Sequence, residues 1–306
     1  MKKLSLILFT LSVSIGCSQL GLTSDDNNDN TNLTYLAAAY LATNSSSSNS
    51  SSSNASQTYS CYGTGSYGST SNISSSLPSW ITKNFYCMTI YSSTESGTEY
   101  YVFETDSVPP HKSPYWGSSS TYYEAMPSGN TAQVSNFNSQ QYKFKIPANP
   151  SSSTVKAAPG IAAGVAVNGV ILFFGEASPG NTLSAELNTF DTPQGHPDGG
   201  YKRYHYHAEP KYIPNYETAI LGVMIDGYPV YGIKEADGTQ PSTSAATGSS
   251  SQYPALDSNA HGHTHSTNEF SSGIFHYHII NWDTTVNIPT MPTYTYGAFS
   301  ISNTTF

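Results

Sequence analysis

The sequence is poor in charged side chains, and cations are especially scarce. Asp, Glu, Lys and Arg make up 10% of the 306 residues, against about 25% in an average soluble protein. Long surface helices depend on Glu, Lys and Arg, so this scarcity disfavours a helical protein. The formal net charge is −9, and the 11 Lys and Arg residues are scattered. We therefore expect no nucleic-acid partner.

Several familiar catalytic signatures are also missing. The sequence has no Gly-x-Ser-x-Gly, no His-Glu-x-x-His and no Gly-rich phosphate-binding loop. It is rich instead in Tyr and Gly, with 24 of each, and it has 18 Pro. Tyr, Thr, Val and Ile fit pleated strands, while Gly and Pro favour turns. The composition therefore predicts a mainly β protein with a sandwich- or barrel-like domain.

Residues 1–16 have the pattern of a secretory signal peptide. Lys2 and Lys3 form a positive end, and the apolar run of about 12 residues that follows is too short to span a bilayer. The run ends at Gly16-Cys17, which resembles a bacterial lipoprotein signal, in which the cysteine is lipidated. An ordinary cleaved signal with an incidental cysteine is the alternative. We expect an extracytoplasmic protein held by this lipid on a bacterial membrane, at the outer membrane or the cell surface.

The three cysteines fit an exported protein. With Cys17 lipidated, Cys61 and Cys87 remain as a pair that can form a disulfide in an oxidising compartment, and two free buried thiols are the alternative. Residues 17–58 are rich in Ser and Asn and cannot form a core, which predicts a disordered tether. The β-rich domain is expected over residues 59–306.

Three sequence landmarks occur twice, in the same order. The first is an apolar run ending in Asn168-Gly169 or Asp226-Gly227, dipeptides typical of hairpin turns. Two unrelated hairpins could share that turn chemistry, but they would not share the landmarks downstream. The sequence therefore predicts internal duplication of a hairpin–loop–His-strand unit, over residues 164–207 and 222–278. The downstream landmarks are Gly195-His196 and Gly262-His263, then Tyr204-His205-Tyr206-His207 and Phe275-His276-Tyr277-His278.

Histidines two residues apart point to the same side of a strand. Two His-x-His strands brought together by a duplicated fold would place four imidazoles around one point. Imidazole binds zinc, copper, iron and nickel, and with no Cys nearby such a site favours zinc or type-2-like copper. Hydrogen-bonded core histidines and a pH-sensing surface are the alternatives. The expected metal ligands are His205, His207, His276 and His278, followed by His196 and His263.

Other polar residues near these histidines are candidates for a second role. The nearby carboxylates Asp198, Glu209, Asp257 and Glu269 could be ligands or general bases, although solvation is the commoner fate of a loop carboxylate. Arg203 is the only arginine and could bind an anionic substrate or stack on a tyrosine. The candidate catalytic residues are Glu269, Asp198 and Arg203.

Taken together, these motifs resemble the YHYH-protein family, an extracytoplasmic domain named for its tetrapeptide. The similarity covers roughly residues 85–300. It strengthens the predicted fold and boundaries, and it implies no settled activity. The residues that carry it are Tyr204-His205-Tyr206-His207, Phe275-His276-Tyr277-His278, Asp226-Gly227-Tyr228-Pro229-Val230-Tyr231-Gly232, Gly262-His263-Thr264, Gly164-Val165-Ala166-Val167-Asn168-Gly169-Val170 and Pro109-Pro110-His111.

Three functions are compatible with the sequence. The favoured one is binding of a transition metal, copper or zinc, which leaves a metal-dependent enzyme open. The second is a non-enzymatic surface binding or adhesion module with structural histidines, since Tyr and Ser are common on recognition surfaces. The third is a hydrolase that uses a histidine base oriented by a carboxylate.

Overall fold

The computed structural model describes residues 60–63, 70–157, 162–177, 182–243, 253–281, 286–299 and 304–305. They belong to one structural unit, Thr58–Phe306. The predicted signal peptide, Cys17 and the predicted tether lie outside the described residues. Within the described part of the chain, no helix is both long enough and apolar enough to cross a membrane.

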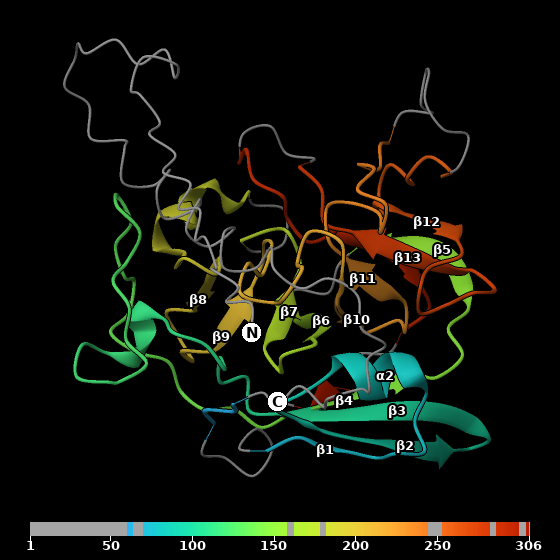
Figure 1. Ribbon diagram of the computed structural model, residues 1–306, viewed down its shortest axis with the longest axis horizontal. Coiled ribbons are helices and arrows are strands. Elements are labelled where there is room, and N and C mark those ends of the chain that lie inside the picture. Colours follow the sequence, from blue (N-terminus) through green and yellow to red (C-terminus); the bar gives the residue numbers. More distant parts are fainter. Residues whose placement is uncertain are drawn as a thin grey trace, which may run out of the picture. The chain divides into compact units, whose positions relative to one another are not determined.

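A five-stranded sheet contains the first strands of the unit (Figure 1). Along β4 the buried Tyr142, Phe144 and Ile146 alternate with the half-buried Lys143 and Lys145, as expected where one face of a sheet meets the core. The sheet order is β1 (Asn72–Ile73), β2 (Thr89–Glu95), β3 (Thr98–Thr105), β4 (Tyr142–Pro147) and β15 (Thr304–Thr305).

An eight-stranded sheet carries both His strands. Its central strands β6 and β10 are buried at every position, as expected for strands covered on both faces. In order it contains β12 (Gly262–His265), β13 (Ile274–His278), β11 (Pro229–Tyr231), β10 (Ile220–Met224), β6 (Ala162–Ala166), β7 (Ile171–Phe173), β9 (Tyr204–Tyr206) and β8 (Gly195–Pro197).

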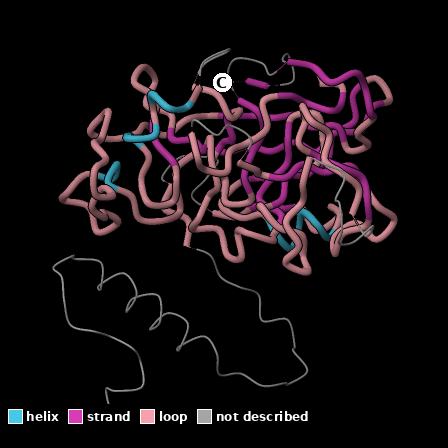
Figure 2. Tube along the Cα trace, turned by 90° about the horizontal axis from the view of Figure 1, so that it is seen from above, coloured by secondary structure: helices cyan, strands magenta, loops and turns pink. Residues whose placement is uncertain are grey.

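The remaining elements are short. A third sheet has two strands, β14 (Tyr294–Gly297) and β5 (Ser152–Ala157). Helix α2 (Ser79–Asn84) buries Ile81. Figure 2 shows that long loops join most of the elements. The 3₁₀ helices are η2 (Pro114–Trp116), η3 (Leu183–Ala185) and η4 (Leu187–Thr189).

The strand order of the large sheet is matched on its two sides. Going outward from the central antiparallel pair of β6 and β10, each side has an antiparallel, then a parallel, then an antiparallel pairing. The register matches too, because Leu172 pairs with Tyr206 on one side and Val230 pairs with Tyr277 on the other. Figure 1 shows β8 and β9 at one end of this row and β13 and β12 at the other. Duplication of the sequence unit itself stays a prediction.

The two larger sheets contribute to one hydrophobic core. Ile90 and Phe103 of the five-stranded sheet belong to the same buried cluster as Val165 and Val223 of the eight-stranded sheet. The predicted mainly β, sandwich-like architecture is confirmed. Neither of these sheets closes into a barrel among the residues that the structure describes.

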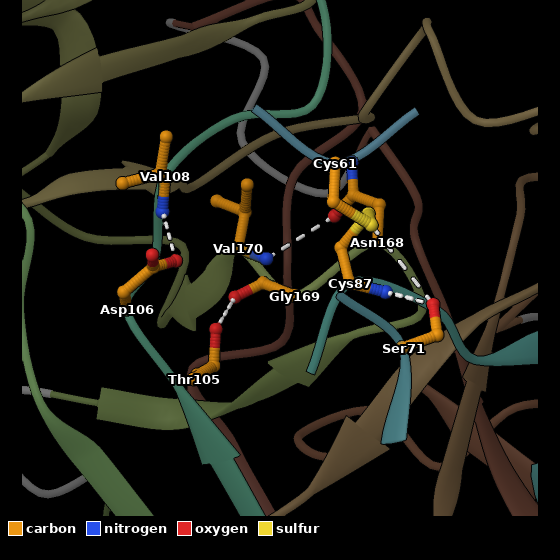
Figure 3. Close-up of a disulfide and its surroundings, with 9 residues drawn as sticks. All are labelled: Cys61, Ser71, Cys87, Thr105, Asp106, Val108, Asn168, Gly169 and Val170. Carbon is orange, nitrogen blue, oxygen red and sulfur yellow. Dashed lines mark hydrogen bonds between the residues drawn. A yellow bond between two sulfur atoms is a disulfide. The ribbon is translucent and has the colours of Figure 1, made fainter. Parts of the chain in front are cut away.

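The turn between β6 and β7 fits closely against the loop that holds a disulfide (Figure 3). Cys61 and Cys87 are joined, with their Cα atoms 5.3 Å apart. Gly169 has a φ of +85°, and a Cβ atom there would lie 2.7 Å from the carbonyl oxygen of Cys87. Thr105 Oγ1 also donates a hydrogen bond to the Gly169 carbonyl oxygen. This turn therefore needs glycine both for its backbone conformation and for its close approach.

We expect Gly169→Ala to lower the free energy of unfolding by about 3 kcal/mol, because the positive φ and the overlap with the Cys87 carbonyl both act against the new side chain. Gly129 is the matched control, since its φ is +88° and no atom lies within 4 Å of its added Cβ. Gly129→Ala should cost about 1 kcal/mol. Urea unfolding of both variants measures the difference, and equal losses would contradict this account of the turn.

Candidate metal centres

The pairing of strands at each edge of the large sheet brings histidines together. His196 of β8 is the register partner of His205 of β9, and His263 of β12 is the register partner of His276 of β13. Directly paired residues have Cβ atoms about 5 Å apart, so their side chains meet on one face. A third histidine, two residues further along the chain, points to the same side in each case.

His196, His205 and His207 form what we call the first group. All three are at most 2% exposed, and one ligand atom from each lies within 4.8 Å of the others. The Nε2 atoms of His205 and His207 are 2.9 Å apart. The ring of Phe173 stacks on His205, with centroids 3.9 Å apart. The first group is therefore enclosed by protein, with an aromatic ring against one of its members.

The hydrogen bonds of the Nδ1 atoms fix the tautomers in the first group. His205 and His207 each face a backbone carbonyl oxygen with Nδ1, so Nδ1 carries the proton and donates it. Thr189 donates its hydroxyl proton to the Glu186 carbonyl, so it accepts from Nδ1 of His196 at 2.7 Å. All three neutral rings therefore present an Nε2 lone pair to the centre of the group. The two carbonyl acceptors belong to Arg203 and Phe174.

Burial keeps these rings neutral. It lowers the pKa of His207 to about 4, and burial together with the neighbouring imidazoles holds the pKa of His196 and His205 well below the usual range. Glu186 Oε2 lies 3.7 Å from Nε2 of both His196 and His207. Burial raises the pKa of Glu186 to about 7. At neutral pH the Nε2 lone pairs of the first group therefore face one another, and too few protons are present to form hydrogen bonds between them.

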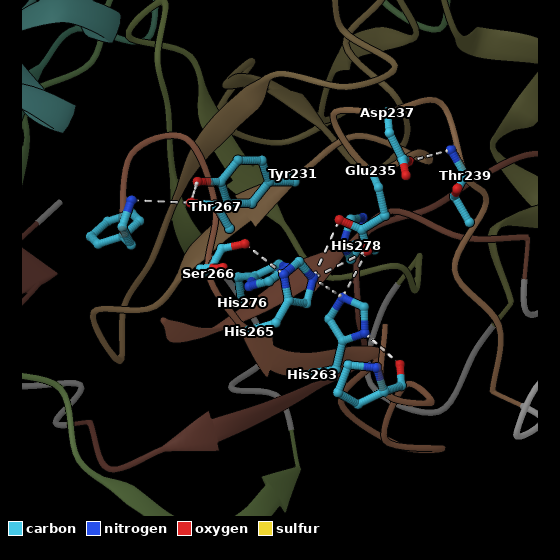
Figure 4. A network of polar contacts seen from close by, with 12 residues as sticks. Tyr231, Glu235, Asp237, Thr239, His263, His265, Ser266, Thr267, His276 and His278 are labelled. Carbon is cyan, nitrogen blue, oxygen red and sulfur yellow. Dashed lines mark hydrogen bonds and ion pairs between the residues drawn. The ribbon is translucent and has the colours of Figure 1, made fainter. Parts of the chain in front are cut away.

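Glu235, His263, His276 and His278 form the second group (Figure 4), and all four are buried. Glu235 Oε1 lies 3.0 Å from Nε2 of His263 and 3.2 Å from Nε2 of His278. His265 adjoins the group, with its Nε2 3.1 Å from that of His263. This group therefore combines imidazole nitrogens with a carboxylate.

The second group has the same tautomer pattern as the first. Every Nδ1 atom faces a backbone carbonyl oxygen and donates its proton to it, which again leaves Nε2 as the atom directed inward. Nε2 of His276 has no hydrogen-bond partner. The acceptors are the carbonyls of Pro254 for His263 at 2.7 Å, Ile274 for His276 at 3.1 Å and Gly232 for His278 at 2.7 Å.

The buried carboxylate of Glu235 can be stabilised either by hydrogen bonds from histidines or by a bound cation. Burial alone would raise its pKa, but hydrogen bonds from His263 and His278 hold the pKa below its usual range. Those bonds require Nε2 of a histidine to carry a second proton, because Nδ1 already donates its own. Burial lowers the pKa of His276 to about 3, and the nearby rings of His278 and His263 add to this effect by electrostatic repulsion. The His276 ring is therefore neutral. A cation among the four residues would satisfy the carboxylate and the lone pairs together.

Both groups fit a metal ion in donor type and in spacing. Metal-bound histidines usually donate their second ring N–H to a carbonyl or carboxylate, as these do. Zinc holds its ligands tetrahedrally at about 2.0–2.1 Å from nitrogen, so two ligand atoms of one ion are about 3.4 Å apart. The ligand atoms of each group lie within 4.8 Å of one another, so shifts of about 1 Å would bring them to that spacing. These buried His and Glu groups could therefore each hold a metal ion.

The prediction that four imidazoles surround one point is wrong. His205 and His207 belong to one group, and His276 and His278 belong to the other. Strands β7, β6, β10 and β11 lie between β9 and β13, which puts the two His strands about 24 Å apart at the usual strand spacing. The physical reason is that the two halves join through their hairpins, where β6 pairs with β10. Each His strand therefore lies on the outer side of its own hairpin, away from the other His strand. His196 joins the first group and His263 the second.

Arg203 and Asp198, both predicted as catalytic candidates, pair with each other. Nε of Arg203 donates to Oδ2 of Asp198 at 2.6 Å. The guanidinium also stacks over Tyr201, 4.9 Å from the ring centroid. The structure thus gives Arg203 the stacking contact that the sequence offered as an alternative to substrate binding.

The other predicted carboxylates lie in different surroundings. Glu269 accepts a hydrogen bond from Tyr231, whose ring contacts that of His276, so it is next to the second group. Asp257 accepts from the backbone of its own turn. Glu209 is buried, and burial raises its pKa to about 7, but it belongs to neither group.

Sequence reasoning missed the carboxylates closest to the histidines, Glu235 and Glu186, and it did not assign His265. Glu235 lies three residues after Gly232, in the loop that leaves β11, where no motif marks it as a ligand. Glu186 follows η3 in the corresponding connection between β7 and β8. Each glutamate thus comes from the connection between the hairpin and the Gly-His strand of its own half.

His111 shows how a structural histidine looks in this protein. Its Nδ1 donates to the Lys112 carbonyl, and its Nε2 accepts from the Tyr206 hydroxyl at 2.6 Å. Both ring nitrogens are therefore paired with protein groups. In the first and second groups, by contrast, the Nε2 atoms point at one another or at a carboxylate.

The fold and the two groups define a mainly β protein with paired histidine-rich centres. Residues 143–258 match a family model described as YHYH protein. The chain therefore carries a YHYH domain over these residues. The matched segment contains the first group and Glu235, and it ends before His263, His276 and His278. Comparison with curated proteins and with solved structures gives no match.

We expect His111→Gln to flatten the loss of stability in acid. The pKa of His111 is about 4 in the folded protein because of burial, against about 6.5 when unfolded. Between these values the unfolded chain binds the extra proton, so the free energy of unfolding falls as the pH falls, by up to about 1.4 kcal/mol per pH unit. Urea unfolding from pH 6.5 to 4.5, with chelator present, measures the slope. An unchanged slope would show that His111 does not titrate as described.

Proposed function

We propose that this protein binds two transition-metal ions outside the cytoplasm, one in each histidine group. The observation that carries the proposal is the convergence of Nε2 atoms, joined by a carboxylate oxygen in the second group, while the Nδ1 atoms donate to fixed oxygens. In the first group two such Nε2 atoms lie 2.9 Å apart, which is unfavourable for neutral rings unless a cation or a proton lies between them. Burial disfavours the proton, as the low pKa of His207 indicates.

A purely structural role for the histidines is less consistent with these contacts. A packed histidine is expected to satisfy both nitrogens, as His111 does with Lys112 and Tyr206. His196 and His276 instead have a buried Nε2 atom with no hydrogen-bond partner. Leaving buried polar atoms unpaired costs about 1–3 kcal/mol each, so an ion that pairs them would stabilise the fold.

A hydrolase of the Ser-His-Asp kind finds little support in the same contacts. Such a mechanism needs a histidine whose Nδ1 donates to a carboxylate. Eight of the nine histidines have a resolved Nδ1 contact, and each contact is to a carbonyl or hydroxyl oxygen. The carboxylates near the groups are therefore better placed as ligands than as orienters of a histidine base.

The donor atoms favour zinc or copper(II). The first group offers three imidazole nitrogens, and the second adds the carboxylate of Glu235. Nitrogen and oxygen donors without thiolate are typical of zinc and of type-2-like copper. A bound ion of this kind supplies a Lewis acid, and copper also supplies redox chemistry. The chain's own contribution is to hold the rings in one tautomer and, in the second group, to place a negative charge among them.

A lipid anchor completes the proposal. The signal-like residues 1–16 and Cys17 support attachment to a bacterial membrane, and the Ser- and Asn-rich residues 17–58 support a tether that holds the domain away from the lipid. A disulfide between Cys61 and Cys87 is consistent with an oxidising compartment. This location would place both histidine groups outside the cytoplasm.

Elemental analysis of the protein loaded with zinc or copper(II) and then desalted is expected to give two ions per chain. His205→Ala and His276→Ala should each lose one ion, because each removes a ligand from one group only. His111→Gln is the control and should keep both. Loading should also raise the free energy of unfolding, by about 2.7 kcal/mol at a free metal concentration one hundred times Kd. Folded wild-type protein that retains no ion would leave the histidines with a structural role.

Cys17→Ser is expected to move the protein from the membrane fraction to the soluble extracytoplasmic fraction of a bacterial host, because the thiol that would carry the lipid is gone. Cell fractionation with immunoblotting measures this, and mass spectrometry of the wild-type N-terminal peptide should show the added acyl mass. A wild-type protein that is already soluble and unmodified would indicate an ordinary cleaved signal.

A further inference from the structure

A cavity of about 480 Å³ adjoins the second group. Its lining includes His265, His276 and Glu235, together with Tyr231 and Glu269. This volume is within the range of small-molecule binding sites, about 300–1,000 Å³. The second group therefore has a space beside it in which a small ligand could approach the histidines.

The two groups differ at the position next to this space. In the first, Phe173 of β7 stacks its ring on His205 with centroids 3.9 Å apart. At the corresponding position of β11, Tyr231 meets His276 edge-on, with centroids 5.1 Å apart. The Tyr231 hydroxyl donates to Oε2 of Glu269 at 2.7 Å. An apolar ring thus covers part of the first group, while a tyrosine and a carboxylate border the second.

His276 links the cavity to the second group. It lines the cavity, and its buried Nε2 atom has no hydrogen-bond partner in the protein. Glu235 lines the cavity as well. A ligand in the cavity could therefore reach an ion held by His276 and Glu235 without displacing either of them.

The charges around the cavity favour a ligand that is not an anion. Two carboxylates, Glu235 and Glu269, contribute to the lining. The one cation in the lining, Lys234, already pairs with Glu217 at 2.6 Å. An ion bound to Glu235 would offset the charge of that residue, which leaves Glu269 to repel an anion. A hydrogen-bond donor on a neutral or cationic ligand can pair with Glu269.

We propose that this cavity is the ligand site of the second centre, and this rests on the proposed metal binding. The ligand is a small neutral or cationic molecule with a nitrogen or oxygen donor for the ion at one end and a hydrogen-bond donor for Glu269 at the other. Glu269 is the residue that determines specificity in this arrangement, because it accepts from the end of the ligand that faces away from the ion. The first centre, beneath Phe173, takes no such ligand.

Imidazole and 1-methylimidazole are a matched pair of probes, since both bind a metal through one nitrogen and only imidazole has an N–H on the other. The test uses the copper(II)-loaded His205→Ala variant, which retains the second group. Imidazole should shift its visible absorption and should bind about tenfold more tightly than 1-methylimidazole, because of the bond to a charged acceptor. Copper(II)-loaded His276→Ala, which retains the first group, should show no shift.

Glu269→Leu, added to His205→Ala, shows whether imidazole binds more tightly because of its hydrogen bond to Glu269 or because 1-methylimidazole carries a bulkier methyl group. Glu269 is only partly buried, so this change should leave the fold intact. Imidazole should then lose its tenfold advantage. An advantage that persists, an absent shift in loaded His205→Ala, or an equal shift in His276→Ala would overturn the ligand site while metal binding stands. A protein that retains no copper before any probe is added overturns the metal-binding proposal, and the ligand site with it.

Discussion

The donation of Nδ1 protons to fixed oxygens is the interaction on which both centres depend. In each group the acceptors are almost all backbone carbonyls, whose positions are set by the fold. This fixes the tautomer of every ring and turns the Nε2 lone pairs toward one place. In the first group burial lowers the pKa of all three rings, and in the second group it lowers the pKa of His276. A group built in this way could hold a metal ion, since its donor atoms already point to one place.

The alternating tetrapeptide serves two purposes at once. Its histidines point to one side of the strand, toward the group, and its tyrosines point to the other side, where Tyr204 donates to Asp191 and Tyr206 reaches the hairpin turn. Asn168 donates to the Tyr206 hydroxyl at 3.1 Å, and in the other half the Tyr277 hydroxyl donates to Asp226. Each tyrosine thus ties its strand to the Asn-Gly or Asp-Gly turn of the same half. The tyrosine bonds fix the position of the strand, and the strand fixes the position of the rings.

The local sequence pattern predicted which histidines point to the same side of a strand. It did not predict which strands pair with one another. Alternation along Tyr204–His207 was enough to place His205 and His207 on one side, and the repeated Gly-His pairs pointed to His196 and His263. The single centre was wrong because the pairing of β6 with β10 separates the His strands, and nothing in the tetrapeptides specifies that pairing. Glu235 was missed for a similar reason, since a loop residue reaches the group only through tertiary contacts.

The two halves have the same strand pairing, but different residues surround their histidines. The strands keep the same pairing and register on both sides of the sheet. The differences come from the connections, which bring Glu235 among one set of rings and leave Glu186 3.7 Å from the other. At the matching strand position, Phe173 and Tyr231 differ by one hydroxyl. That hydroxyl donates to Glu269 beside a cavity, so under our proposal one hydroxyl at a shared strand position is enough to give the two groups different access to ligands.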